Sequence, residues 1–154
     1  MPSNSTPKVI LLRGEPPARE ALVASAVVTP GMLLAMTSTG AARPHNVAAG
    51  MASPLFARED EYEGKSIDDT IAIGSLVGIW ACTSGDQIYS LVKAGAAAIV
   101  AGDYLESAGD GTFQKSTHAV TSATTAAAVP VARALEAVDN SGGGSAVRIR
   151  VEVL

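Results

Sequence analysis

The fold is decided by the stretch Gly102-Asp103-Tyr104-Leu105-Glu106-Ser107-Ala108-Gly109-Asp110-Gly111-Thr112-Phe113-Gln114. Two short apolar runs flank its Gly-Asp-Gly turn. Asp-Gly between extended segments favours a β-hairpin, because glycine and aspartate tolerate the positive φ that tight turns need. The stretch therefore predicts a hairpin, and with it a protein made of short strands and turns.

The first half of the chain repeats the skeleton of this hairpin. Shifted by 71 positions, Gly31-Met32-Leu33-Leu34 aligns with Gly102-Asp103-Tyr104-Leu105, and Gly40 aligns with Gly111. The alignment predicts an internal duplication. The alternative is that a β protein reuses glycine-led turns without any duplication.

The repeat continues after the hairpin with a change of register. Phe56-Ala57-Arg58 aligns with Val131-Ala132-Arg133 if the later half carries about four extra residues. Those residues would fall in the low-complexity run 122–128, which consists of serine, threonine and alanine. This pattern describes strands and turns and contains no chemistry.

Composition limits the class of protein. With 154 residues the chain is long enough for one domain with a sizeable core. Hydrophobic residues make up 47% but aromatic residues only 4%, which favours a β core of small side chains. The net charge is -4 and no basic residues cluster, so nucleic acid is not expected as a partner.

The N-terminal residues predict an extended arm that leads into a strand. Residues 1–7 are polar and proline-containing, and Lys8-Val9-Ile10-Leu11-Leu12-Arg13 is an apolar segment of strand length. We expect an arm with a strand over 1–14 and a single β-rich domain over 15–154. The strand either pairs with an edge, in this fold or in a partner, or is an internal first strand. Without a signal pattern or a membrane-spanning run, we expect synthesis in the cytoplasm and no membrane partner.

The remaining pattern predicts a mainly β fold, a small barrel or sandwich with glycine-rich turns and at most one or two short helices. Turns arrive about every ten residues, and residues 76–82 and 87–92 are of strand length. Residues 18–28 are ambiguous, since residues 18–24 fit a helical turn or two and residues 26–28 fit a strand better. Val147, Ile149, Val151 and Val153 alternate with charged residues and predict a strand with one buried face. The methionines of residues 32–36 are interpreted as core residues.

No catalytic, cofactor-binding or metal-binding residue is predicted. Cys82 lies in an apolar run and is interpreted as a buried structural thiol. His45 and His118 lack partners at metal-site or catalytic spacing and are interpreted as polar loop residues. The acidic segment 59–69 lacks the ligand spacing of a calcium loop and is interpreted as a solvated loop or an electrostatic interface.

A succession of motifs at turns and strand edges runs along the chain. They are Pro30-Gly31-Met32-Leu33-Leu34, Pro54-Leu55-Phe56-Ala57-Arg58-Glu59-Asp60-Glu61, Gly64-Lys65-Ser66-Ile67-Asp68-Asp69, Gly85-Asp86, Gly95, Gly102-Asp103-Tyr104-Leu105 and Gly109-Asp110-Gly111. This succession resembles that of a tailed-bacteriophage head decoration (capsid cement) protein of the lambda type, and the resemblance covers roughly residues 8–154.

The resemblance implies a structural virion protein, not an enzyme, that is made in the host cytoplasm. It would bind the outer surface of an icosahedral head and stabilise the expanded capsid, as homotrimers at local threefold positions. Its partners would be the major capsid protein and its own copies. The alternatives are another phage subunit, such as a tail tube or connector, and a small β-barrel enzyme or ligand-binding module.

Two groups of residues are candidates for these contacts. In the family the N-terminal arm adds a strand to the capsid protein, and the matching residues here are Lys8, Val9, Ile10, Leu11 and Leu12. Opposite charges also suggest a contact between neighbouring subunits. The residues expected there are Glu59, Asp60, Glu61, Arg148 and Arg150.

Overall fold

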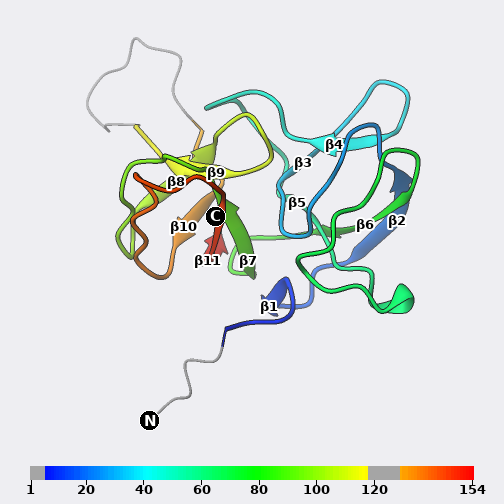
Figure 1. The fold of residues 1–154 in the computed structure, drawn as a ribbon, viewed down its shortest axis with the longest axis horizontal. Helices are drawn as coiled ribbons and strands as arrows, with labels where there is room; N and C mark the ends of the chain where they lie inside the picture. Colours follow the sequence, from blue (N-terminus) through cyan, green and yellow to red (C-terminus); the bar gives the residue numbers. More distant parts are fainter. Residues whose placement is uncertain (1–5, 118–128) are drawn as a thin grey trace.

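The computed structural model describes residues 6–117 and 129–154 and shows a mainly β protein (Figure 1). Its strands are β1 (Leu11–Arg13), β2 (Ala18–Val23), β3 (Leu34–Met36), β4 (Ala42–Pro44), β5 (Leu55–Ala57), β6 (Leu76–Ala81), β7 (Gln87–Val92), β8 (Tyr104–Ser107), β9 (Phe113–Lys115), β10 (Ala132–Ala134) and β11 (Val147–Val153). Within the described residues the helical structure is a 3-10 turn, η1 (Glu61–Glu63). The predicted fold class is therefore confirmed.

Strands β7 to β11 form a closed barrel, which we call the second barrel (Figure 1). The strands are hydrogen-bonded in the order β7-β11-β10-β8-β9, and a parallel pairing of Val92 with Phe113 joins β9 back to β7. The hairpin predicted over 102–114 is the antiparallel pair β8–β9.

Strands β2 to β6 form a first barrel with the same strand order. The sheet β2-β6-β5 and the hairpin β3–β4 are joined by two isolated bridges. Leu33 pairs antiparallel with Phe56, next to β3 and in β5, and Ala24 pairs parallel with Ala42, after β2 and in β4. The bridges close the ring in the order β2-β6-β5-β3-β4.

The two hairpins have the same pairing register 71 positions apart. The paired residues are Leu34 with Pro44, Ala35 with Arg43 and Met36 with Ala42 in β3–β4, and Leu105 with Lys115, Glu106 with Gln114 and Ser107 with Phe113 in β8–β9. Every partner in the second hairpin lies 71 positions after its counterpart in the first. The predicted internal duplication is therefore confirmed at the level of structure.

The last two strands of each barrel also correspond, and they correct one alignment. The paired residues are Leu55 with Ala81, Phe56 with Trp80 and Ala57 with Ile79 in the first barrel, and Ala132 with Val153, Arg133 with Glu152 and Ala134 with Val151 in the second. Phe56 therefore corresponds to Arg133, not to Val131 as predicted. The later half carries six extra residues before β10, because pairing register sets the correspondence and residue similarity does not.

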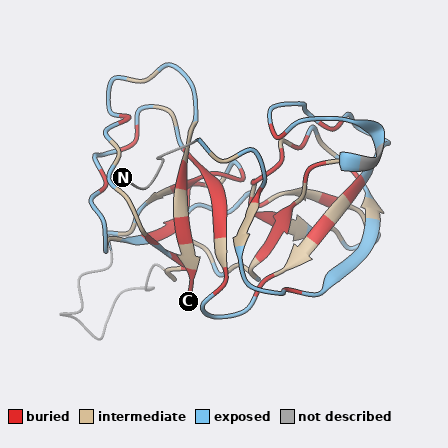
Figure 2. Cartoon of the chain, turned by 90° about the horizontal axis from the view of Figure 1, so that it is seen from below, coloured by how far each residue is buried: buried red, intermediate tan, exposed pale blue. Residues whose placement is uncertain are grey.

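Each barrel has its own apolar cluster, and the larger cluster extends across the junction (Figure 2). The first-barrel cluster contains small and branched residues such as Ala42, Val77 and Ile79. The second-barrel cluster also takes in Leu33 and Phe56 from the first barrel. The two barrels therefore share packed apolar surface, which stabilises their contact.

The predicted N-terminal strand belongs to this fold. β1 pairs antiparallel with β7 through Leu11 and Ile88, and the Tyr89 amide donates to the carbonyl of Ile10 at 2.8 Å. Ile10 is fully buried, whereas Val9 is exposed. Of the two alternatives, the structure shows edge pairing within this fold, because β1 is the end strand of its sheet and pairs with β7 of the same chain.

Three further expectations have clear outcomes. Residues 18–23 form β2 and not a helical turn, because they pair with β6. In β11 the residues Ile149, Val151 and Val153 are buried, which confirms the predicted one-sided strand. Met36 is exposed at the end of β3, so its interpretation as a core residue is wrong.

Candidate functional site

The contact between the two barrels centres on the β8–β9 turn. The Leu33 amide donates to the carbonyl of Gly111 at 2.8 Å, and the Gly111 amide donates to the carbonyl of His45 at 3.0 Å. Gly111 has φ +82, and a Cβ there would lie 2.8 Å from Cβ of Pro44. Glycine is therefore required both for the backbone conformation and for the close approach.

His45 supports the same junction from its loop. Its ring is buried, with Nδ1 2.7 Å from Oγ of Ser107 and Nε2 3.1 Å from the carbonyl of Met51. A carbonyl only accepts, so Nε2 carries the proton, and in the neutral ring Nδ1 accepts from the Ser107 hydroxyl. His45 thus lies in a loop, as predicted, and its ring is buried and serves a structural role. His118 lies outside the described residues.

A second contact joins β7 to the turn before β3. The buried hydroxyl of Ser90 donates to the carbonyl of Gly31 at 2.7 Å. A Cβ at Gly31 would lie 2.7 Å from the carbonyl oxygen of Tyr89, so the backbones are closely packed here. The rings of Phe56 and Phe113 pack nearby at a centroid distance of 6.1 Å.

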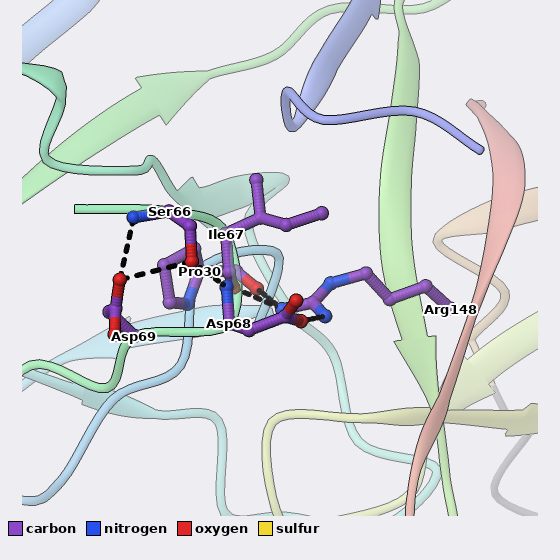
Figure 3. Close-up of polar contacts among 6 residues, drawn as sticks. All are labelled: Pro30, Ser66, Ile67, Asp68, Asp69 and Arg148. Carbon is purple, nitrogen blue, oxygen red and sulfur yellow. Dashed lines mark hydrogen bonds and ion pairs between the residues drawn. The ribbon is translucent and has the colours of Figure 1, made fainter. Parts of the chain in front are cut away.

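Arg148 of β11 holds the acidic loop against the second barrel (Figure 3). Its Nη1 lies 2.5 Å from Oδ1 of Asp68, and its Nη2 donates to the carbonyl of Pro30 at 3.1 Å and to the carbonyl of Ile67. The Arg148 side chain is only 12% exposed. A charged donor with three acceptors in a partly buried position is the stronger kind of hydrogen-bonding arrangement.

The neighbouring turn presents Asp68 to this arginine. The Ser66 amide and hydroxyl donate to Oδ2 of Asp69 at 2.7 and 3.0 Å (Figure 3). These two donors, the amide foremost, hold the pKa of Asp69 below its ordinary value. The ionised carboxylate therefore fixes the turn that carries Asp68.

Glu59 joins the arm strand to the first barrel. Its carboxylate is buried, and Oε1 accepts from the amide of Ile10 at 3.2 Å. Oε2 of Glu59 has no hydrogen-bond partner among the described residues. The first residue of the predicted acidic loop is therefore a buried contact to the arm and is not solvated.

The other residues predicted for a subunit interface lie at different places. Asp60 accepts from the amide of Glu63 at 3.3 Å and caps η1, and Glu61 is exposed. The Arg150 amide donates to Oε1 of Glu136 at 2.8 Å, and its Nη1 lies 3.6 Å from Oε2 of that residue.

The two arginines thus have acidic partners within the chain, and their contact with a neighbouring subunit stays a prediction. Sequence analysis did not single out Asp68 as the partner of Arg148, or Glu136 as the partner of Arg150. A usable signal for Glu136 was its place just after β10, the strand that pairs with β11. For Asp68 the sequence holds no such signal, because β11 is 80 residues away along the chain.

The side chains that could act as a nucleophile or as metal ligands are not arranged for either role in the described residues. Cys82 is buried, and desolvation, aided by nearby Asp86, raises the pKa of its thiol to about 12. Because of this raised pKa, the Cys82 thiol is a weak nucleophile at neutral pH. Within residues 6–117 and 129–154 no group of His, Cys, Asp and Glu is arranged to hold a metal ion.

A groove of about 590 Å³ lies among residues of β2, β6 and the segments 58–65 and 71–75 of the first barrel. Arg58 crosses it, with its guanidinium carbon 4.7 Å from the ring centroid of Trp80. The groove combines apolar residues with charges of both signs, and its lining includes Arg19, Ala21, Glu63, Lys65, Leu76 and Gly78. Such a mixed surface suits contact with another protein.

No known protein family and no curated protein sequence matches this chain. Across the part of the chain that the structure describes, no helix is both long and apolar enough to cross a membrane. Function is therefore inferred from the two barrels, their junction and the arm strand.

Proposed function

We propose that the protein is a head decoration protein that binds the outer surface of an icosahedral phage head and stabilises the expanded capsid, as trimers at local threefold positions. The observation that carries this proposal is the position of β1. It lies at the end of the six-stranded sheet and pairs with β7 on one side. A strand of the major capsid protein would add to its other side.

Strand addition suits this edge for physical reasons. A sheet edge presents backbone donors and acceptors that an extended partner strand satisfies, and neighbouring side chains supply specificity. Lys8 and Val9 precede β1 and are exposed, so they are available to a partner. Ile10 is committed to the core of this chain and anchors the edge.

The surroundings of the reactive side chains also support a structural role. Cys82 has a raised pKa in a buried position, and both ring nitrogens of His45 are engaged at the barrel junction. A cement protein needs rigid barrels and a complementary surface, since repetition over many sites turns modest contacts into a stable shell.

The test is density-gradient co-sedimentation with expanded heads of the phage that encodes the protein. Three chains are compared: the full chain, a chain lacking residues 1–7, and a full-length Val9→Asp variant. None of these changes removes Ile10, so each chain keeps the core contact of the arm. We expect the full chain to travel with the heads at saturating stoichiometry and the two altered chains to bind at least tenfold more weakly.

Exposed Met51 provides the matched control, as Met51→Asp places the same charge on an apolar site away from β1. Equal binding of the Val9 and Met51 variants would contradict the role of the β1 edge. Failure of the full chain to bind heads would contradict the proposed function itself.

A further inference from the structure

The junction between the barrels is heterologous, meaning that the two barrels contribute different faces. The second barrel contributes Ser90, Arg148 and the β8–β9 turn, and the first contributes the backbone around Gly31 and Leu33. If a twofold axis related the barrels, every contact would occur a second time with the roles exchanged.

The exchanged contacts are absent from the described residues. The register of each barrel assigns Gly40 as the counterpart of Gly111, and Gly102 as the counterpart of Gly31. Gly111 and Gly31 are buried in the junction, whereas a Cβ at Gly40 or at Gly102 would meet no described atom within 4 Å. A heterologous junction of this kind leaves one face of each barrel without its partner.

We define the front face as the first-barrel counterparts of the residues that the second barrel contributes. Strand pairing matches Leu22 with Ser90 and Leu76 with Arg148. The hairpin register matches Met36 with Ser107 and the β3–β4 turn with the β8–β9 turn. Leu22 packs against the first-barrel cluster, so the front face consists of Met36, Gly40 and Leu76.

We define the back face as the second-barrel counterparts of the residues that the first barrel contributes. The shift of 71 positions matches Ala101 with Pro30, Gly102 with Gly31, Tyr104 with Leu33 and Ser116 with His45. The first-barrel residues are buried, whereas Ala101, Gly102 and Tyr104 are exposed.

Both faces carry exposed large apolar side chains at positions whose counterparts in the internal junction are polar or buried. Leu76 is 63% exposed in the place of Arg148, and Met36 is 44% exposed in the place of buried Ser107. On the back face Tyr104 is 53% exposed, and Val100 beside it is also exposed. Exposed apolar residues gathered in one place mark a contact surface.

A groove at the front face also indicates a contact surface. One wall of the groove of about 590 Å³ is formed by Arg19 and Ala21 of β2 and Leu76 and Gly78 of β6, and its other lining residues lie in the segments 58–65 and 71–75. The corresponding strands of the second barrel, β7 and β11, are covered by Pro30, Gly31 and Asp68 at the internal junction. The groove is thus open where its counterpart is filled.

We infer that the front face of one chain docks on the back face of a second copy and repeats the internal junction between chains. The occupant is a second copy because the internal junction depends on backbone contacts of a hairpin turn, and the two hairpins have the same register. The inference places Leu76 beside Ala101, Met36 beside Ser116 and the β3–β4 turn beside Tyr104 of the next copy. It rests on the proposed function only for the number of copies, which is three on a shell.

Cysteine cross-linking with a short bismaleimide tests this arrangement. A mixture of the Leu76→Cys and Ala101→Cys variants is expected to yield a cross-linked pair of chains on a denaturing gel, whereas each variant alone yields none. The double variant, with both cysteines in one chain, is expected to yield ladders of more than two chains or a closed ring. Native Cys82 is buried and contributes no background. A mixture of Met51→Cys and Ala101→Cys is the matched control and should stay uncross-linked.

The reaction is run at millimolar protein in solution and again on expanded heads. Cross-linking of single variants with themselves would show a twofold contact and overturn the inference. The lack of a cross-linked mixed product both in solution and on heads would also overturn the inference. If the protein does not bind heads, the solution reaction alone decides. Head binding without the mixed product contradicts only this inference, and the mixed product without head binding contradicts only the proposed function.

Mass measurements on Leu76→Lys and Tyr104→Lys give an independent readout. Each variant keeps one intact face, so each alone is expected at the monomer mass of 15.5 kDa, and their mixture is expected to stop at two chains. Both side chains are exposed, so thermal midpoints close to that of the native protein will show that the variants are folded. An assembly of wild-type size from either variant alone would overturn the inference.

Discussion

Arg148 and Asp68 lie in different barrels, 80 residues apart, and their side chains approach to 2.5 Å. The two ends of this ion pair differ in environment, because the arginine side chain is 12% exposed and the aspartate side chain is 79% exposed. Most of the contribution to stability therefore resides in Arg148 and its bonds to backbone carbonyls. Exposed ion pairs by themselves contribute little.

Arg148→Met is expected to lower the free energy of unfolding by about 1–3 kcal/mol, because it leaves the carbonyls of Pro30 and Ile67 without this donor. Asp68→Asn should cost less than about 1 kcal/mol. Urea denaturation measures both. Arg133→Met is the matched control and should have a small effect, because the Arg133 side chain in its pair with Glu152 is 44% exposed and that of Arg148 is 12% exposed. Equal costs for Arg148 and Arg133 would contradict the assigned role.

Glu59→Ala is expected to lower the free energy of unfolding by about 1–3 kcal/mol, because the buried amide of Ile10 loses its acceptor. Hydrogen exchange at the Ile10 amide should be faster in this variant than in the native protein. Glu61→Ala changes an exposed carboxylate in the same segment and serves as the control. Unchanged exchange at Ile10 would show that Glu59 does not hold the arm strand.

Ile10→Ala is expected to cost about 2–5 kcal/mol, as for other fully buried aliphatic side chains. Val9→Ala, one position earlier and exposed, should change stability by less than about 0.5 kcal/mol. Thermal or urea unfolding of the two variants compares them directly. Similar small effects would mean that β1 detaches from β7 without cost.

The protein is expected to lose stability as the pH is lowered below about 4, partly because the Asp69 carboxylate becomes protonated. The folded protein holds the pKa of this carboxyl below its ordinary value of 3.8, so the stabilising contribution is present above that value. The contribution is lost as the pH falls through the folded pKa, because protonation breaks the bonds from Ser66. Asp69→Asn should therefore show a smaller loss of thermal midpoint between pH 5 and about pH 3 than the native protein. An identical pH profile would contradict this assignment.

Cys82 is expected to react slowly with a thiol reagent at pH 8, because burial raises its pKa to about 12 and excludes the reagent. The rate should rise by orders of magnitude in unfolding concentrations of urea. Leu76→Cys, which adds an exposed thiol, is the reference and should react at once. Fast reaction of Cys82 in the native protein would show that this part of the fold opens readily.

Local patterns in the sequence determined the hairpin over 102–114 and the alternating strand β11, and they predicted a repeat that the pairing registers bear out. These features depend on turn chemistry and on period-two alternation, which neighbouring residues specify among themselves. The helical alternative for β2 was wrong because pairing with β6 overrides the weak helical preference of residues 18–24. The misaligned Phe56 shows the same limit, since only strand pairing defines the register.

Tertiary structure alone decided which residues meet. The burial of Glu59 and His45, the contact of Arg148 with Asp68 and the fixed docking of Ile10 all join segments distant in the sequence. No local pattern encodes such contacts, because they arise when two similar barrels pack through different faces. For the same reason the sequence predicted a duplication, and only the structure showed that, among the described residues, the contacts of the internal junction do not occur a second time with the roles exchanged.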